Sequence, residues 1–370
     1  MERFRQQIET LLASADVRIG GLRPWDIAVH NEDLYRRVLA RGSLGLGESY
    51  MDGWWDCPAL DQFFDRILSA GLDETVMDWR IFLQSMRANL MNLQKKSRAF
   101  QVGRRHYDLG NELYRSMLDR SMTYSCACWN GAKDLDEAQE TKLDLLARKV
   151  RLGQGMKILD IGCGWGGFAR HAAERYGVRV VGTTVSEKQA RLGRERCEGL
   201  PVEVRLQDYR DLDGTYDAVV SVGMIEHVGI KNYRKFMKIV HGCLEDGGLF
   251  LLQTIGGNQS VRKCDPWIGK YIFPNGMLPS IRQLAESFEG LFVVEDWQNL
   301  GADYDRTLMA WFANFDGNWD RIRHLYDERF YRMWKYYLLS CAGSFRARRN
   351  QLWQIVLSKG GIRGGWNIEQ

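Results

Sequence analysis

The chain has 370 residues, of which 45% are hydrophobic and 26% are charged, so its composition excludes a disordered or fibrous protein. This length allows one large domain and a smaller one. The formal net charge of +4 is too small to indicate nucleic-acid binding, and no apolar run approaches the roughly 18 residues of a membrane-spanning helix.

Residues 1–85 have helical patterns and predict a small helical domain. The first twelve, "MERFRQQIETLL", are charged and place Met1, Phe4 and Ile8 on one helical face, which is not typical of a signal peptide. The segment 58–72 predicts a second amphipathic helix. Between them, "GSLGLGESYMDGWWDC" is rich in glycine and aromatic residues and predicts a structured loop.

A basic linker is predicted over residues 86–105. From Met86 to Arg105 the sequence has six basic residues and no acidic one. The first interpretation is a solvated linker face. The second is a contact surface for anionic lipid head groups, where each lysine or arginine contributes about 1 kcal/mol.

From about residue 155 the pattern alternates between strands and helices, and residues 106–370 are predicted to form the larger domain. Short apolar runs alternate with helical segments of about ten residues or more, which predicts an α/β fold with helices on both faces of a parallel sheet. The expected strands are "MKILDIG", "VRVVGTTV", "VEVRLQD", "YDAVVSVGM", "LFLLQTI", "LFVVEDWQNL" and "QLWQIVLS".

The first of these strands runs through "LDIGCGWGG" directly into a helix. Its glycines allow a tight turn close to a ligand, and the helix offers unpaired N–H groups. Dinucleotide enzymes and S-adenosylmethionine enzymes share this arrangement. Asp160 before the first glycine, the short loop and the absence of an acidic residue in "GTTVSEKQ" favour S-adenosylmethionine. The alternative is a packing turn without a ligand.

The stretch "LDIGCGWGGFARHAAERYGVRVVGTTVSEKQ" resembles the methyltransferase core of the cyclopropane-fatty-acyl-phospholipid synthases, relatives of the mycolic acid cyclopropane synthases. The resemblance extends to "HYDLGNELYRSMLD", "YSCACW", "SVGMIEHVG", "DPWIGKYIFPNG", "DWQNLGADYDRTLMAW" and "AGSFRARRNQLWQ", so it covers nearly the whole chain. It implies a class I S-adenosylmethionine methyltransferase, Rossmann-like with a mostly parallel seven-stranded sheet, which makes residues 106–370 the catalytic domain and 1–85 a lipid-associated or membrane-associated domain.

The resemblance also implies a reaction and a location. The reaction adds a methylene group from S-adenosylmethionine across a cis double bond of an unsaturated phospholipid acyl chain, through a carbocation that bound bicarbonate deprotonates. The expected location is the cytoplasm, peripheral on the inner face of a bacterial membrane, with the phospholipid bilayer as partner. Members of the family are often dimers, so a homodimer is also considered.

The site residues implied by the resemblance form two sets. The bicarbonate set is Cys126, Glu226, Gln253, the amide of Ile255, and Tyr304. The set that contacts S-adenosylmethionine is Tyr124, Ser125, Asp160, Gly162, Gly164, Gly166, Gly167, Thr184, Gln189, Asp208 and Tyr209. No metal ligand is expected, because the eight cysteines lack metal-type spacing and favour a reducing cytoplasm.

Gln253 is the departure from the family pattern, which has histidine at this position. Glutamine can still donate a hydrogen bond, but it cannot carry a proton charge. The substitution leaves the strength of bicarbonate binding open, and weaker binding is the hypothesis to test. His227 is interpreted as structural, since neighbours at a strand end alternate in direction. Cys126 is assigned to anion binding instead of covalent catalysis, because forming a carbon–carbon bond needs no covalent enzyme intermediate.

Several aromatic residues admit two interpretations, core packing or cation–π contact with the carbocation. They are Tyr107, Tyr124, Trp129, Trp267, Tyr271, Phe273, Tyr304 and Trp311. For Tyr124 and Tyr304 the resemblance favours the site, because both lie in family motifs that face it. His106 and Asp108 either order a loop over the cofactor or act as ordinary caps. Three other functions compete with the leading one. They are a related methyltransferase that forms a methyl-branched lipid or methylates a small amine, a catalytically inactive protein that binds S-adenosylmethionine or associates with a membrane, and a Rossmann dehydrogenase.

Overall fold

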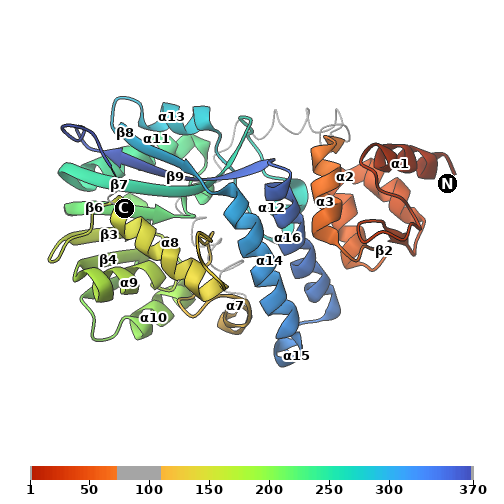
Figure 1. The fold of residues 1–370 in the computed structure, drawn as a ribbon, viewed down its shortest axis with the longest axis horizontal. Coiled ribbons are helices and arrows are strands. Elements are labelled where there is room, and N and C mark those ends of the chain that lie inside the picture. The colour runs from red at the N-terminus through yellow and green to blue at the C-terminus, as the bar shows by residue number, and fades with distance from the viewer. Residues whose placement is uncertain (1, 73–109, 368–370) are drawn as a thin grey trace. The chain divides into compact units, whose positions relative to one another are not determined.

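A computed structural model describes residues 2–72 and 110–367 of the chain (Figure 1). These residues group into two compact units. The first contains residues 2–72, Lys263–Pro274 and Tyr304–Asn350, and the second contains residues 110–262, Asn275–Asp303 and 351–367. The predicted linker 86–105, with the boundary at residue 106, lies outside the described residues and stays a prediction. Two segments beyond that boundary, 263–274 and 304–350, nevertheless group with the N-terminal helices.

The second unit is built on a seven-stranded sheet with the strand order β5-β4-β3-β6-β7-β9-β8. Strands β3 to β7 pair with one another in parallel, and β8 and β9 pair antiparallel. The mostly parallel sheet is therefore confirmed. The strands are β3 (Lys157–Ile161), β4 (Arg179–Thr184), β5 (Val202–Leu206), β6 (Tyr216–Val222), β7 (Leu244–Gly257), β8 (Val293–Asn299) and β9 (Asn350–Ser358).

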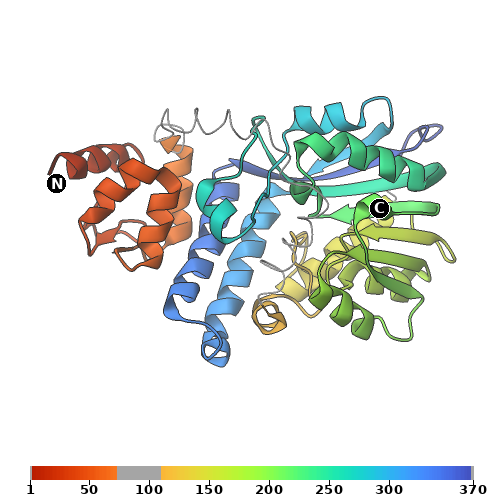
Figure 2. The ribbon, with the colours of Figure 1, turned by 180° about the vertical axis from the view of Figure 1, so that it is seen from behind.

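Helices cover both faces of this sheet (Figures 1 and 2). On one face, Phe250 of β7 joins a core cluster with side chains from the helices α11 and α13, and on the other face Leu251 joins a cluster with α8 and α9. Because consecutive strand residues point to opposite faces, a strand buried on both sides has a continuous apolar run. The helices of this unit are α7 (Asn111–Met117), α8 (Leu135–Lys149), α9 (Gly167–Tyr176), α10 (Glu187–Arg196), α11 (Ile230–Cys243) and α13 (Ile281–Phe288).

The strand order reverses direction at β3. From β3 the chain builds outward through β4 and β5, and it then returns to place β6 on the other side of β3. In open α/β sheets, ligands bind at this switch point, outside the carboxyl ends of the strands. The predicted site residues Asp160 and Thr184 lie at the ends of β3 and β4, and Glu226 follows β6.

The described part of the first unit is mainly helical, with a two-residue antiparallel strand pair, β1 (Ala28–Val29) and β2 (Trp55–Asp56). A Cβ on Gly343 of α16 would lie 2.5 Å from the Asp61 carbonyl oxygen of α3, so this glycine lets the two helices approach closely. The helices are α1 (Glu2–Ser14), α2 (Asp33–Met51), α3 (Leu60–Ser69), α12 (Pro266–Tyr271), most of α14 (Gly301–Gly317), α15 (Trp319–Ile322) and α16 (Glu328–Arg346).

The prediction of a loop over "GSLGLGESYMDGWWDC" is wrong for its first half, which is the second part of α2. The helix is interrupted at Gly42, where φ is 55° and ψ is −135°, and then continues through Gly45 and Gly47. A Cβ on Gly47 would overlap the ring of Trp267. Glycine here permits close packing instead of marking a turn, and composition alone does not distinguish these two uses.

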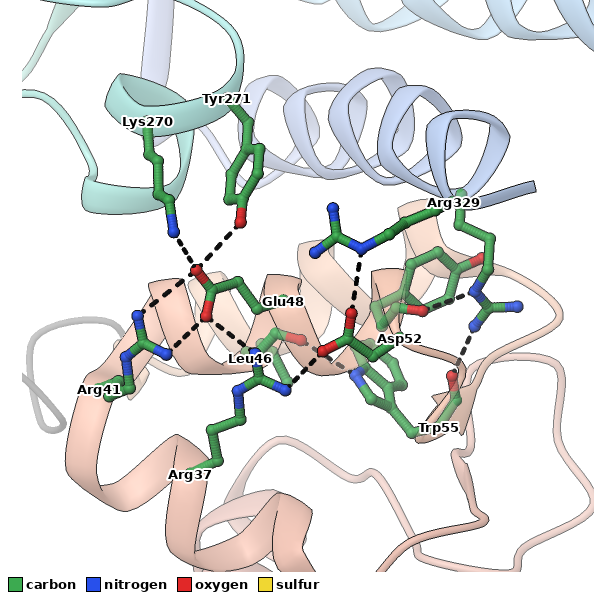
Figure 3. A network of polar contacts seen from close by, with 11 residues as sticks. Arg37, Arg41, Leu46, Glu48, Asp52, Trp55, Lys270, Tyr271 and Arg329 are labelled. Atoms are coloured by element: carbon green, nitrogen blue, oxygen red, sulfur yellow. Dashed lines mark hydrogen bonds and ion pairs between the residues drawn. The ribbon is translucent and has the colours of Figure 1, made fainter. Parts of the chain in front are cut away.

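A buried carboxylate, Glu48 on α2, joins three basic side chains and a phenol within the first unit (Figure 3). Its oxygens accept hydrogen bonds from Lys270 and Arg41 at 2.6 Å, from Arg37 at 2.9 Å and from Tyr271 at 3.0 Å. Burial acts to raise the pKa of Glu48, but the hydrogen bonds from Lys270, Arg37 and Tyr271 outweigh it and lower the pKa to about 2. The carboxylate therefore connects α2 to α12.

Candidate active site

The glycine-rich loop after β3 has the geometry that a close approach to a ligand requires. Gly162, Gly164 and Gly166 have φ values of 85°, 56° and 81°, which disfavour other residues. The Gly162 N–H donates to the carbonyl of Thr183 at 2.9 Å, which ties the loop to the end of β4. A Cβ on Gly167, the first residue of α9, would lie 2.8 Å from the Ser121 carbonyl oxygen.

Asp160 is the acidic residue of this loop, and it is 2% exposed. Among the described residues, its Oδ2 atom is buried without a hydrogen-bond partner. Burial raises the pKa of Asp160 to about 7, although the nearby Lys142 lowers it in part. A buried carboxyl oxygen without a donor can accept a hydrogen bond from the cationic group of a ligand. The role of Asp160 toward a cofactor stays a prediction.

The segment that precedes Tyr124 lies close to this loop, since a Cβ on Gly167 would also lie 2.8 Å from the hydroxyl oxygen of Thr123. The ring of Tyr124 makes an edge contact with Tyr114 at 5.2 Å, and Tyr114 contacts Trp165 of the glycine loop at 4.7 Å. Gln139 of α8 donates from Nε2 to the carbonyl of Ser125 at 2.8 Å. Tyr114 therefore lies between Tyr124 and the glycine loop, and the roles of Tyr124 and Ser125 toward a cofactor stay predictions.

The predicted cofactor residues after β4 and β5 are paired with their own neighbours. The Thr184 hydroxyl donates to Oε1 of Gln189 at 2.8 Å. The carboxylate of Asp208 forms an ion pair with Arg210 at 3.0 Å, and Tyr209 packs against Phe236. These contacts hold the side chains in place at the strand ends, and their roles toward a cofactor stay predictions.

Glu226 and Ile255 are joined directly. The Ile255 N–H donates to Oε1 of Glu226 at 2.8 Å, whereas Oε2 of Glu226 is buried without a partner among the described residues. Burial raises the pKa of Glu226 to about 7. The sequence analysis assigned the Ile255 amide to an anion, but in this structure its hydrogen binds the Glu226 carboxylate.

Gln253 lies on β7 and is paired with a residue that the sequence analysis missed. Its side-chain oxygen accepts a hydrogen bond from Nε2 of Gln354 on β9 at 2.9 Å, and both side chains are buried. Among the described residues, the side-chain nitrogen of Gln253 has no hydrogen-bond partner, so it remains available as a donor. The sequence does contain a signal that could have identified Gln354, because it is a polar residue inside the apolar strand sequence "QLWQIVLS".

Cys126 and Tyr304 belong to different units. Cys126 is buried in the second unit, with its thiol 3.2 Å from the carbonyl of Ala127. Tyr304 lies on α14 in the first unit and packs against Phe345 with ring centroids 4.7 Å apart. The membership of Tyr304 in the site therefore stays a prediction.

Five of the predicted aromatic residues have contacts within the described part of the first unit. They are Trp267, Tyr271, Phe273, Tyr304 and Trp311. Trp267 is buried against Gly47 and Tyr336, and the hydroxyl of Tyr271 donates to Glu48. His106, Tyr107 and Asp108 lie outside the described residues. Burial lowers the pKa of His227 to about 4, so its ring is neutral near pH 7, and its structural role stays a prediction.

Lys142 is a second residue that the sequence analysis missed. It lies on the buried face of α8, and its ammonium donates to the Ser125 hydroxyl at 3.2 Å. The signal in the sequence is its helical spacing, because Lys142 falls four residues after Ala138 and four before Leu146, which are both buried.

Comparison with known proteins gives one family. The family model described as mycolic acid cyclopropane synthetase matches residues 94–355. The chain is 54% identical to the cyclopropane-fatty-acyl-phospholipid synthase of Escherichia coli (strain K12), over 95% of this chain and 92% of that protein. It is 35% identical to the tuberculostearic acid methyltransferase UfaA1 of Mycobacterium tuberculosis, over 90% and 83% of the two chains.

A solved structure agrees with these similarities. The mycolic acid cyclopropane synthase CmaA1, in a complex with SAH and CTAB, matches with a TM-score of 0.66 and 34% identity. The match covers 70% of this chain and 98% of that one.

Proposed function

The chain belongs to the mycolic acid cyclopropane synthetase family, and we propose that it transfers a methylene group from S-adenosylmethionine to the cis double bond of an unsaturated phospholipid acyl chain. It is an S-adenosylmethionine-dependent enzyme of the cyclopropane synthase type. The observation that carries the proposal is the 54% identity over 95% of the chain, which includes residues of both units.

The chemistry fits the residues of this chain. An alkene attacks the methyl group of a sulfonium donor without prior deprotonation, so a Ser/His/Asp relay is not required. The transfer leaves a cation on the acyl chain, which a dry and apolar site protects from water. A base must then remove one proton from the transferred methyl group so that the ring closes, and for this step position matters more than base strength.

The residues at the end of β6 and β7 fit a bound bicarbonate, which supplies that base when it is present. Oε2 of Glu226 is a buried acceptor for the bicarbonate O–H, and the Gln253 side-chain nitrogen is a donor for one of its oxygens. The Ile255 amide orients Glu226 by donating to Oε1. Cys126 and Tyr304 complete the proposed set.

The bilayer is the proposed partner and the inner face of a bacterial membrane the proposed location. The basic segment 86–105 supports this assignment by its sequence alone, since it lies outside the described residues. Within residues 2–72 and 110–367, no helix is both long and apolar enough to cross a membrane. A homodimer also stays a proposal.

The product is the feature that tests the proposal. We expect that expression of the chain in a bacterial host lacking cyclopropane lipids adds one CH₂ to unsaturated fatty acids and removes the double bond. Mass analysis of the fatty acids, before and after ozonolysis, measures both changes. A methyl-branched fatty acid would instead support the related methyltransferase activity, and an unchanged lipid profile would contradict both.

The variant Gln253→His tests the anion site. A neutral imidazole accepts the Gln354 hydrogen bond at one nitrogen and donates from the other, so the pairing on β9 is kept. A protonated imidazole would add positive charge beside the anion. We expect higher activity than the wild type at low bicarbonate and equal activity at saturating bicarbonate. The same bicarbonate dependence in both proteins would show that Gln253 does not contact the anion.

A further inference from the structure

Lys142 is a buried base that has no counter-ion within residues 2–72 and 110–367. Its side chain is 1% exposed, and its single hydrogen bond, to the neutral hydroxyl of Ser125, is 3.2 Å long. No ion pair involves Lys142 among the described residues. Burying an ammonium without a negative partner costs several kcal/mol. This cost is consistent with the effect of burial, which lowers the pKa of Lys142 to about 8.

The nearby carboxyl groups do not supply the missing partner. Asp119 uses Oδ1 to accept from the Thr123 N–H at 3.0 Å, and it uses Oδ2 to accept from the N–H and the hydroxyl of Ser121. Asp160 is close enough for its charge to influence the pKa of Lys142, but the two groups form no ion pair. Among the described residues, the positive charge of Lys142 has no ion-pair partner, and Oδ2 of Asp160 has no hydrogen-bond partner.

These two groups lie at the same part of the fold. Asp160 is the last residue but one of β3 and leads into the glycine loop. Lys142 donates to Ser125, two residues after Thr123, whose hydroxyl oxygen would lie 2.8 Å from a Cβ on Gly167 at the end of that loop. The charges of Lys142 and Asp160 are also close enough to influence each other. A ligand that satisfies both must carry a cation and an anion a few bonds apart. The α-ammonium and α-carboxylate of an amino acid have this arrangement.

We propose that Lys142 binds the α-carboxylate of S-adenosylmethionine, together with the Ser125 hydroxyl, while Asp160 binds the α-ammonium group of the same ligand. The inference rests on the proposed methyl donor and assigns its amino-acid end to named side chains. The competing explanation is that Lys142 only holds the segment 124–126, as Gln139 does one turn earlier on α8.

The test is a comparison of two ligands. S-adenosylhomocysteine keeps both charges, whereas its decarboxylated analogue, 5′-deoxy-5′-(3-aminopropylthio)adenosine, keeps only the ammonium. Calorimetric titration of the full chain should show that S-adenosylhomocysteine binds at least about tenfold more tightly than the decarboxylated analogue. A hydrogen bond between charged groups increases affinity by about 10- to 100-fold. In Lys142→Met this preference should fall to within about threefold.

A matched variant separates ligand binding from support of the segment. Gln139→Met removes hydrogen bonds from the same face of α8 to the carbonyls of Thr123 and Ser125, so it should weaken both ligands by the same factor. Lys142→Met should also unfold at an unchanged or higher urea concentration, because it removes an unpaired buried charge.

Three results would overturn the inference. The first is equal weakening of both ligands in Lys142→Met. The second is a wild-type protein that binds both ligands equally, which decides the question even if the variant does not fold. The third is a wild-type protein that binds neither ligand, and only this result would also contradict the proposed methyl donor.

Discussion

Glu226→Gln is expected to lose at least about 100-fold in cyclopropane formation while the protein stays folded, because the carboxylate would orient the bicarbonate base and a positioned base contributes about 10²–10⁴-fold. The variant keeps a side-chain oxygen for the Ile255 N–H, which the carboxylate binds at 2.8 Å. It replaces Oε2, the buried acceptor proposed for the bicarbonate O–H, with an NH₂ group that can only donate. The measurement is product formation per minute at saturating bicarbonate.

The same variant should also change how stability depends on pH. Burial raises the pKa of Glu226 from its usual 4.5 to about 7. The neutral carboxyl therefore contributes stability that is complete below pH 4.5, the ordinary value, and is lost as the pH rises through about 7. Glutamine cannot ionise, so the variant should gain on the order of 2–3 kcal/mol over the wild type between pH 5 and pH 8.

Thermal unfolding at both pH values measures this gain. Asp160 also has a raised pKa, but it is present in both proteins, so the difference between them reports Glu226 alone. Glu226→Ala is the companion variant, because it also removes the acceptor for the Ile255 N–H. It should lose activity as well, and it should be less stable than Glu226→Gln. Wild-type activity in Glu226→Gln would contradict the proposed role of this carboxyl group.

Most of the second unit could be predicted from the sequence because its signals are local. The run 249–252 is apolar at every position, and each of its residues is buried in the sheet. The segment "LDIGCGWGG" predicts a strand, a turn and a helix start, and all three occur at the predicted residues. Parallel strands buried on both faces have this pattern wherever they occur.

The remaining features depend on contacts between residues far apart in the chain. Gly47 belongs to a helix because Trp267 packs on it, and Gln253 is paired because Gln354 lies on the neighbouring strand. The Ile255 amide is joined to Glu226 by the turn after β6. Periodicity gives the face on which a residue lies, but it does not give the partner that meets it there.

The second large effect is expected at Glu48, where Glu48→Gln should lower the free energy of unfolding by about 3 kcal/mol at pH 7, near the lower end for breaking a buried ion pair. The side chain of Glu48 is 4% exposed, and it binds Lys270, Arg37 and Arg41 as well as Tyr271. The expected loss is near the lower end of that range because the side chains of Arg41 and Lys270 are 43% and 51% exposed and can turn toward water when Glu48 is replaced.

The pH dependence of this effect has the opposite sign to that of Glu226. The pKa of Glu48 is lowered from 4.5 to about 2, so its contribution is complete above pH 4.5 and is lost as the pH falls through about 2. The difference between the variant and the wild type should therefore be constant from pH 5 to pH 8 and should shrink below pH 4.5. Urea unfolding at fixed pH values, followed by circular dichroism, measures it.

Asp52→Asn is the matched control for Glu48→Gln. Asp52 is the C-cap of α2, one turn after Glu48, and it pairs with Arg37 and Arg329, but its side chain is 29% exposed. We expect a loss below about 1 kcal/mol, which added salt reduces further, since exposed pairs are weak and screened. Equal losses from the two variants would show that the burial of Glu48 adds nothing to its ion pairs, and that α2 and α12 are held together by packing around Trp267 instead.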